Sequence, residues 1–175
     1  VLLGQNVNSY LRSEMEEIAA YFGKKTLRET DESEFFASIK KLRENHSDRA
    51  ILRAIHFFNE NNRVGKLVNA LDQDDFDGFK HYIQESGNSS YKFLQNVYAS
   101  SDPQNQAVSL ALALSENILG NHGVCRVHGG GFAGTIQAFV ENDYVEIYKK
   151  EIEKSFGQGS CLVLKVRAKG GCKVL

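Results

Sequence analysis

The sequence predicts an α+β domain, with helices over about residues 5–119 and a small antiparallel sheet over about residues 120–175. Two observations favour this class. Apolar residues recur at helical spacing in the first part, and after Gly120 the pattern changes to short runs in which apolar and polar side chains alternate. No linker rich in Pro, Gly and Ser and no internal repeat divides the chain, so we expect a single domain over 1–175.

The first two predicted helices are recognised by their ends. The first carries apolar residues at helical spacing from Tyr10 to Phe22 and ends at Gly23. The second starts at Asp31, and Glu34 lies three residues further on, which is the spacing of a capping box. Both helices are expected to bury one apolar face.

Two more helices follow in the predicted helical part. One begins after Ser47 and extends to about residue 71. The next opens at the acidic turn 72–77, because carboxylates stabilise a helix N-terminus, and we expect the polar run Ser86 to Ser90 to interrupt it. Helical spacing then resumes at Tyr91.

The last predicted helix of this part has both of its ends marked. Asp102 is a candidate N-cap, Pro103 fits the first helical position, and Gly120 follows the C-terminal end. The helix is apolar on nearly all sides, so we expect it to be well buried.

The remaining elements predict a sheet. Strands are expected at Val124 to Val127, Thr135 to Val140 and Cys161 to Val166, with a helix at Tyr144 to Phe156 whose Ile147 faces inward. Helix, strand, strand, helix, strand in this order makes most of a ferredoxin-like split βαβ unit. The predicted fold is therefore this sheet with additional N-terminal helices.

Charge and cysteine content narrow the class of protein. The 21 Lys and Arg residues nearly cancel the 22 Asp and Glu residues and form no basic patch, which argues against a nucleic-acid partner. No apolar run approaches 18 residues, so we expect no membrane span. The three cysteines, Cys125, Cys161 and Cys172, contain no Cys-x-x-Cys pair and cannot all pair with one another; we interpret them as reduced thiols of a cytoplasmic protein.

The candidate binding site is the glycine-rich connection between the first two predicted strands. Its residues are Gly129, Gly130, Gly131, Phe132, Ala133 and Gly134, with Arg126 and His128 as supporting residues. Glycines leave the backbone thin and free to adopt positive φ, so that successive N–H groups can face an anion or a sugar. We expect Gly130 and Gly131 to face ligand and the Phe132 ring to anchor the loop. The alternative is a flexible hairpin loop without a ligand, which glycine content fits equally well.

Two common phosphate-binding motifs are excluded. No Gly-Lys-Ser/Thr follows the glycines, so the segment is not a P-loop. A strand and not a helix is expected after it, which excludes a Rossmann fingerprint.

The pattern Arg-x-x-Gly-Gly-Gly-Phe-(Gly/Ala)-Gly at 126–134 resembles the third motif of the galactokinases, within the group of galactose, homoserine and mevalonate kinases. The resemblance covers nearly the whole chain. It includes Arg53-Ala54, His56, Glu60 and Arg63-Val64, the run Ser86-Gly87-Asn88-Ser89-Ser90, the segment Phe156 to Cys161, and Gly170-Gly171.

The resemblance implies the C-terminal domain of a bacterial galactokinase, which in the intact protein uses ATP and Mg²⁺ to phosphorylate galactose to galactose 1-phosphate. The family's ATP loop, galactose-recognition segment and catalytic Asp and Arg belong to an N-terminal half, so we expect no catalytic residue, no bound cofactor and no activity in this chain alone. The expected partners are its own N-terminal kinase domain and galactose. An exposed domain face is also expected, through which a homodimer could form.

The glycine segment departs from the family pattern in two places. Val127-His128 stands where many relatives have Met-Thr, and Ala133-Gly134-Thr135 stands where they have Gly-Gly-Cys, so the sugar could differ. Two alternatives stay open. One is a galactose-sensing or interaction module without catalysis, and the other is a kinase of the same group with another substrate.

Three further candidate sites have weaker support. His122, Cys125 and His128 have the spacing of metal ligands, but a spacing of three in a strand places neighbours on opposite faces. The acidic turn 72–77 does not have the register of a calcium loop. His56 lies between apolar residues and is interpreted as a packed core histidine.

Overall fold

The structure is a computed structural model, and it describes residues 3–131 and 134–166. Within that part the helices are α1 (Leu3–Tyr21), α2 (Glu32–Ala37), α3 (Ile39–Asn45), α4 (Asp48–Asp72), α5 (Phe76–Ser89), α6 (Ala107–Leu119) and α7 (Val145–Phe156). A 3₁₀ turn η1 (Leu27–Glu29) and a π-helical turn η2 (Ser90–Leu94) add to these, and the strands are β1 (Gly123–Val127) and β2 (Ile136–Val140). The predicted α+β class is confirmed.

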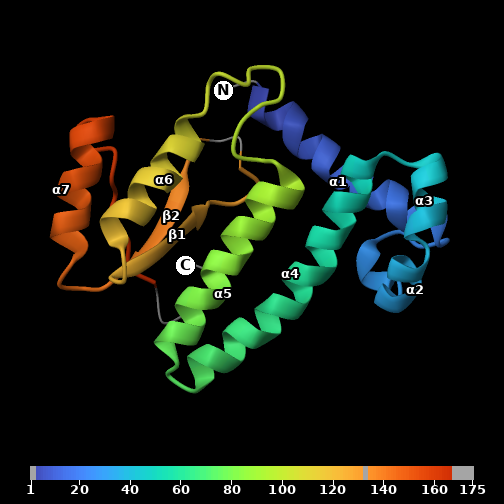
Figure 1. The fold of residues 1–175 in the computed structure, drawn as a ribbon, viewed down its shortest axis with the longest axis horizontal. Coiled ribbons are helices and arrows are strands. Elements are labelled where there is room, and N and C mark those ends of the chain that lie inside the picture. Colours follow the sequence, from blue (N-terminus) through green and yellow to red (C-terminus); the bar gives the residue numbers. More distant parts are fainter. Residues whose placement is uncertain (1–2, 132–133, 167–175) are drawn as a thin grey trace, which may run out of the picture.

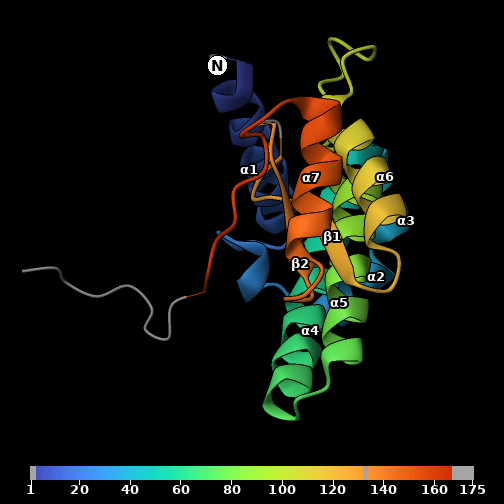
Figure 2. The same cartoon turned by 90° about the vertical axis from the view of Figure 1, so that its left-hand side faces the viewer.

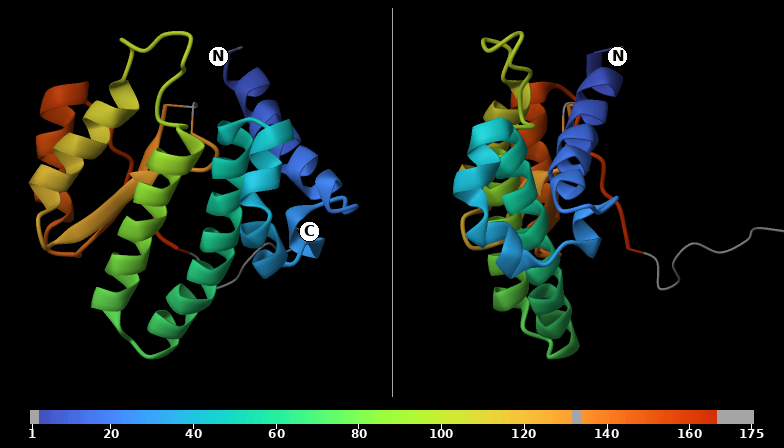
Figure 3. Two further views of the ribbon diagram at one scale, coloured as in Figure 1. Left: turned by 45° about the vertical axis from the view of Figure 1, so that its right-hand side comes forward. Right: turned by 90° about the vertical axis from the view of Figure 1, so that its right-hand side faces the viewer.

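The long helices α4 and α5 form an antiparallel hairpin through the middle of the molecule (Figure 1). On one side α1 packs along α4, and α2 and α3 lie near the N-terminal half of α4 (Figures 1 and 3). On the other side β1 packs against α5, and α6 and α7 cover the two strands (Figure 2). The α4–α5 hairpin therefore separates a helical core from a sheet-containing core.

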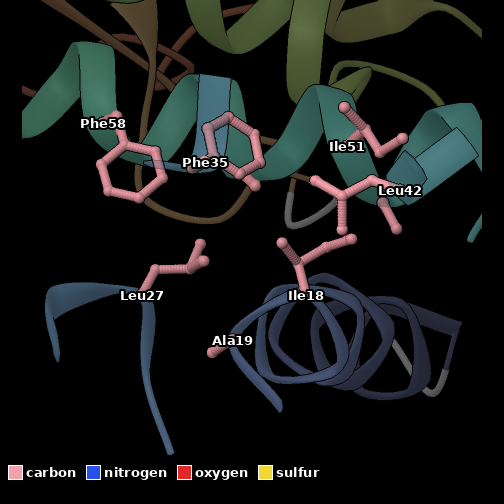
Figure 4. Packing of buried hydrophobic residues seen from close by; sticks show 9 residues of the cluster. Ile18, Ala19, Leu27, Phe35, Leu42, Ile51 and Phe58 are labelled. Carbon is pink, nitrogen blue, oxygen red and sulfur yellow. The ribbon is translucent and has the colours of Figure 1, made fainter. Parts of the chain in front are cut away.

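The helical core is formed by large apolar side chains from α1 to α4 (Figure 4). Phe35 is completely buried, and its ring centroid lies 5.0 Å from that of Phe58. Burial of each such side chain contributes about 1.5–3 kcal/mol. Other buried members are Ile18, Ala19, Leu27, Leu42, Ala50, Ile51 and Ala54.

The predicted starts of two helices are confirmed by side-chain caps. The Asp31 carboxylate accepts a hydrogen bond of 2.8 Å from the backbone N–H of Glu34, and the Ser47 hydroxyl accepts one of 3.1 Å from that of Ala50. Such caps satisfy backbone donors that have no partner within the helix. The second predicted helix is divided at Ser38 into α2 and α3.

The strands β1 and β2 form an antiparallel pair whose register runs from Gly123 opposite Val140 to Val127 opposite Ile136. Both strands and α7 confirm the predictions. The strand predicted at Cys161 to Val166 is wrong, because this segment has no strand structure and Leu164 is 86% exposed. A strand is stable only when it pairs with a neighbour, and none of the described residues pairs with this segment. In the described part of the chain the sheet is therefore a two-stranded antiparallel hairpin, and the third strand of the predicted split βαβ unit is not formed.

The predicted start of α6, the last helix before the sheet, is also wrong. This helix begins at Ala107 and not after Asp102, because residues 99–105 form successive turns. The backbone N–H of Asp102 donates to Ala99 O, and that of Asn105 donates to Asp102 O. The predicted end at Gly120 is confirmed, with φ +50°.

Two apolar side chains expected to be buried near the sheet lie at the surface. Leu110 on α6 is half-exposed, because α6 packs on the sheet and α7 with only part of its circumference. Ile147 on α7 is also half-exposed, whereas Tyr148 and Ile152 on the same helix are buried. None of the described helices is long and apolar enough to cross a membrane.

The polar run Ser86 to Ser90 does not interrupt α5, so this prediction is wrong as well. The helix continues through Ser89 into the π-helical turn η2. Ser86, Ser89 and Ser90 are all buried, and each hydroxyl has a partner from another part of the chain. Tertiary hydrogen bonds here outweigh the weak helix propensity of serine.

Candidate functional site

The glycine loop connects β1 to β2 at the end of the hairpin near the C-terminus of α5. The backbone N–H of His128 donates to Thr135 O at 3.1 Å and closes the base of the loop. Gly129, Gly131 and Gly134 have φ of +59°, +73° and +79°, a region that residues with a Cβ rarely adopt. Three of the loop glycines therefore adopt the positive φ that the sequence predicted. Phe132 and Ala133 lie outside the described residues.

The three glycines with positive φ have different surroundings. A Cβ added at Gly129 or Gly134 would meet none of the described atoms within 4 Å. A Cβ added at Gly131 would lie 2.0 Å from the backbone oxygen of Asn96, and Gly131 is buried. As far as the described residues show, Gly129 and Gly134 have space for a side chain, whereas Gly131 is required for packing.

Asn96 packs against the glycine loop through its backbone oxygen, next to Gly131. It follows η2 and is completely buried, and its Oδ1 accepts a hydrogen bond of 3.2 Å from the Ser90 hydroxyl. Gln95, just before it, has φ +53°, which turns the chain sharply at the end of the π-helical turn. The loop is therefore anchored to the end of α5, and sequence reasoning did not find Asn96.

A polar network joins α4, α5 and β1 next to the loop. Ser86 on α5 donates its hydroxyl hydrogen to Glu60 on α4 and accepts a hydrogen bond of 2.6 Å from Nη1 of Arg126 on β1. Arg126 also lies 3.7 Å from Glu60. On the next turn His56 Nδ1 lies 2.9 Å from the Ser89 hydroxyl. Residues from three of the segments that carry the family resemblance thus meet in one cluster.

The charges within this network are nearly compensated. Arg63 pairs with Glu60 and lies 3.6 Å from Glu85, while Arg126 approaches Glu60 from β1. Burial lowers the pKa of His56; the Glu60 carboxylate opposes this shift, and the positive charges of Arg63 and Arg126 add to it. His56 is therefore neutral at pH 7, and the cluster is suited to holding elements in place.

Close approach of α5 to β1 explains the glycine in the serine run. A Cβ added at Gly87 would lie 3.0 Å from the Cβ of Arg126 and 3.5 Å from the backbone oxygen of Cys125. A larger residue would push the helix away from the strand. The Ser86–Arg126 hydrogen bond depends on this short distance.

The other residues singled out in the sequence lie elsewhere. His128 is exposed at the base of the loop. Arg53 belongs to a different cluster, in which it contacts Glu14 on α1 at 2.5 Å. Asp75 caps α5 by accepting from the backbone N–H of Gly78 at 2.9 Å, which accounts for the acidic turn.

The His122, Cys125 and His128 spacing does not form a metal site. Cys125 is buried with its Sγ 3.8 Å from Leu112 O, and burial raises its pKa to about 12. His122 stacks on Tyr144 and lies 2.8 Å from a Glu141 oxygen. Among the described residues, no three His, Cys, Asp or Glu side chains are arranged to hold a metal ion.

The chain is similar to known kinases in both sequence and fold. No family model matches it. It is 30% identical over 145 residues to the galactokinase of Glaesserella parasuis and 31% identical over 145 residues to that of Thermotoga neapolitana, which covers 83% of this chain in each case. The crystal structure of Lactococcus lactis galactokinase complexed with galactose matches 88% of this chain with a TM-score of 0.64 at 21% identity.

Over most of its length the chain is similar to part of a galactokinase. It spans 36% of the Glaesserella relative, 37% of the Thermotoga relative and 38% of the Lactococcus structure. In this chain, the glycine loop and the Glu60–Ser86–Arg126 cluster come from segments far apart in sequence, and the fold brings them to the same end of the β1–β2 hairpin.

Proposed function

We propose that this domain belongs to a kinase that uses ATP to phosphorylate galactose at its anomeric hydroxyl, giving galactose 1-phosphate. The observation that carries the proposal is the meeting of Glu60, Ser86 and Arg126 beside the loop. These residues belong to the segments through which the chain resembles galactokinases. Relatives named galactokinase at about 30% identity support the same activity.

The contribution of this domain to the reaction is the glycine loop. Phosphoryl transfer depends mainly on alignment and on stabilisation of developing negative charge. Gly129 and Gly134 are exposed, and a Cβ at either would meet none of the described atoms within 4 Å, so a phosphoryl group or sugar hydroxyl could approach the backbone there. Mg²⁺ bound with ATP would neutralise phosphate charge. The catalytic acid–base groups are proposed to lie in an N-terminal kinase domain.

The Arg126 cluster holds the loop in position. Its guanidinium is held by Ser86 through Nη1 and by the backbone oxygen of Val127 through Nε, and it lies 3.7 Å from Glu60. Val127 and His128 separate Arg126 from Gly129, and the backbone of Asn96 lies against Gly131. Two contacts thus fix the loop between α5 and the sheet, which favours a preorganised backbone.

The proposed partner is the N-terminal kinase domain of the same protein. Val64, Val68 and Leu71 lie along the second half of α4, each about half-exposed, and Phe76 beyond the turn is 67% exposed. This end of the α4–α5 hairpin projects from the rest of the domain (Figure 1). Interfaces between domains commonly bury about 600–1,500 Å² and would cover such side chains. The alternative is a homodimer that forms through the same face. We also propose that the protein is cytoplasmic.

A kinase of the same group acting on another sugar is the second candidate. The exposed His128 beside Gly129 favours it, since this position departs from the family pattern. A His side chain at the base of the loop would add a hydrogen-bonding group near a bound sugar.

The test is a turnover assay with ATP and a panel of hexoses, which compares this domain alone with the longer protein that contains it. The proposal predicts activity on galactose in the longer protein and none in the isolated domain. Activity on a different sugar alone would favour the second candidate. Binding of galactose without turnover in the longer protein would indicate a sensor and contradict the kinase.

A further inference from the structure

A cavity of about 510 Å³ borders β2, and none of the described residues that line it belongs to β1. Residues 160–165, which follow α7 and run back past the strands, line another side (Figure 2). Apolar side chains of α6 and α7, among them Ala111, Tyr148 and Ile152, line the rest. Lys165 is the one charged residue in the described lining, so the cavity suits an apolar occupant.

The hydrogen-bond pattern of the strand pair fixes which backbone groups of β2 face β1. At one end the N–H of His128 donates to Thr135 O, and at the other the N–H of Glu141 donates to His122 O. Hydrogen-bonded pairs alternate with non-hydrogen-bonded pairs along antiparallel strands. Every second residue between Thr135 and Glu141 therefore bonds to β1, and the others direct their N–H and C=O groups to the opposite edge.

The backbone groups on this outer edge belong to Ile136, Ala138 and Val140, whereas Gln137 and Phe139 bond to β1. The described residues form a sheet of two strands, and none of their backbone–backbone hydrogen bonds uses the outer groups. Unpaired edges of this kind are the places at which a further strand is added to a sheet.

The side chains of β2 are also less well covered than those of β1. Cys125 and Val127 on β1 are 2% and 1% exposed. Their partners across the strand pair, Ala138 and Ile136, lie on the same face of the sheet and pack against the same apolar cluster, yet both are only partly buried. The apolar face of the sheet is therefore well covered at β1 and incompletely covered at β2.

Residues 161–166 have the side-chain pattern of a strand without a strand partner. Leu162, Leu164 and Val166 stand at alternate positions and are strongly exposed, and the backbone–backbone hydrogen bonds of the described chain include none from this segment. The order β2, α7, segment is that of a crossover, which connects two parallel strands of one sheet. The cavity is lined by both β2 and this segment, so it occupies the place of a strand that would pair with them.

We propose that an extended segment from another part of the longer protein adds as a strand to the outer edge of β2 and fills this cavity. Because β2 has five residues, the added strand needs about five residues, a length of about 17 Å. Its alternate side chains that face α6 and α7 would be apolar. This chain spans 36% of the Glaesserella relative, so a protein of that length has ample further sequence to supply the strand. The inference does not depend on the reaction that the longer protein catalyses.

A small apolar ligand is the competing interpretation of the cavity. Such a ligand would contact Tyr148 and Ile152 but would leave the outer backbone groups of β2 unpaired. The two interpretations therefore differ in whether the amides on the outer edge are protected from exchange with solvent.

The experiment compares amide hydrogen exchange in the 175-residue chain with that in the longer protein. In the 175-residue chain, the amides of Ile136, Ala138 and Val140 should exchange at least about tenfold faster than those of Gln137 and Phe139. In the longer protein all five should be similarly protected. Outer amides that exchange equally fast in both proteins would overturn the proposal. Protection that appears in the 175-residue chain as its concentration rises would also overturn it, because a second copy would then occupy the edge.

Proline variants test the pairing itself. The N–H of Ala138 points to the outer edge, so Ala138→Pro removes no hydrogen bond to β1 and should lower the Tm of the 175-residue chain only slightly. In the longer protein the same variant removes a bond to the added strand, and the Tm should fall by about 5 °C more. Gln137→Pro is the matched control, because it breaks a bond to β1 and should lower the Tm strongly in both proteins. Equal effects of Ala138→Pro in the two proteins would overturn the proposal. Should Ala138→Pro fail to fold, the exchange rates of the unmodified proteins still decide.

Discussion

Arg126 donates a hydrogen bond of 2.6 Å to the hydroxyl of Ser86, forty residues earlier in the chain. The same hydroxyl donates to Glu60 on a third element, so one serine joins α4, α5 and β1. Gly87 permits this contact by letting α5 approach the strand. The serine run of α5 therefore helps to hold β1, and β1 leads directly into the glycine loop.

Replacing Ser86 with alanine should destabilise the domain. The substitution leaves the partly buried Glu60 and Arg126 without their shared partner, which costs about 1–3 kcal/mol of the free energy of unfolding. Asn88→Ala is the control, since Asn88 lies on the same helix and is exposed. Urea denaturation of both variants measures the difference. Equal stabilities would mean that the hydroxyl bridge contributes nothing.

Gly131→Ala should cost more stability than Gly134→Ala. Both residues have positive φ, so each substitution carries a strain of about 1 kcal/mol. The added Cβ at Gly131 would also collide with Asn96 O, whereas the Cβ at Gly134 would meet no atom of the described residues within 4 Å. Melting temperatures of the two variants provide the comparison. A larger loss for Gly134→Ala would contradict the packing of Gly131 on Asn96.

Phe35→Ala should destabilise the helical core by about 3–5 kcal/mol, because it removes a completely buried ring. Phe36→Ala provides the control, since its neighbouring ring is 40% exposed and its loss should cost much less. Chemical denaturation distinguishes them. Similar losses in the two variants would show that the core is not centred on Phe35.

The lowered pKa of the buried His56 leads us to expect a loss of stability in mild acid. Its pKa in the folded state lies below the ordinary 6.5, so the unfolded chain binds a proton more readily. The contribution of neutral His56 is complete above about pH 6.5 and is lost as the pH falls below that value. His56→Gln should flatten this part of the stability profile, whereas His81→Gln, on an exposed side chain, should leave it unchanged. An identical slope in wild type and His56→Gln would refute the assignment.

Local signals predicted several elements of the fold. The caps at Asp31 and Ser47 act within three residues of chain, so the sequence pattern contains the whole interaction. The turn from β1 to β2 likewise follows from its glycines. The sequence predicted that the run Ser86 to Ser90 interrupts the helix, but the helix continues because its serine hydroxyls form hydrogen bonds with residues on α4 and after η2. No local pattern indicates these contacts.

Other errors have the same physical origin. Asp102 and Pro103 form a good local signal for a helix start, yet the chain makes turns there and the helix begins at Ala107. Cys161 to Val166 alternates like a strand but has no described neighbour with which to pair. At the site, the sequence indicated the glycines but could not separate Gly131, which packs on Asn96, from Gly129, which borders open space. That distinction depends on a contact between distant segments.

The most direct test of the proposed function compares Gly129→Ala with Gly23→Ala in the longer protein that contains this domain. Both glycines have positive φ, at +59° and +68°, and within the part of the chain described a Cβ at either would meet nothing within 4 Å. The two variants should therefore lose similar stability, about 1 kcal/mol each. If the loop faces the reacting groups, kcat/KM for galactose phosphorylation falls at least about tenfold in Gly129→Ala and stays at the wild-type value in Gly23→Ala. Equal kcat/KM in the two variants would contradict a ligand-facing loop.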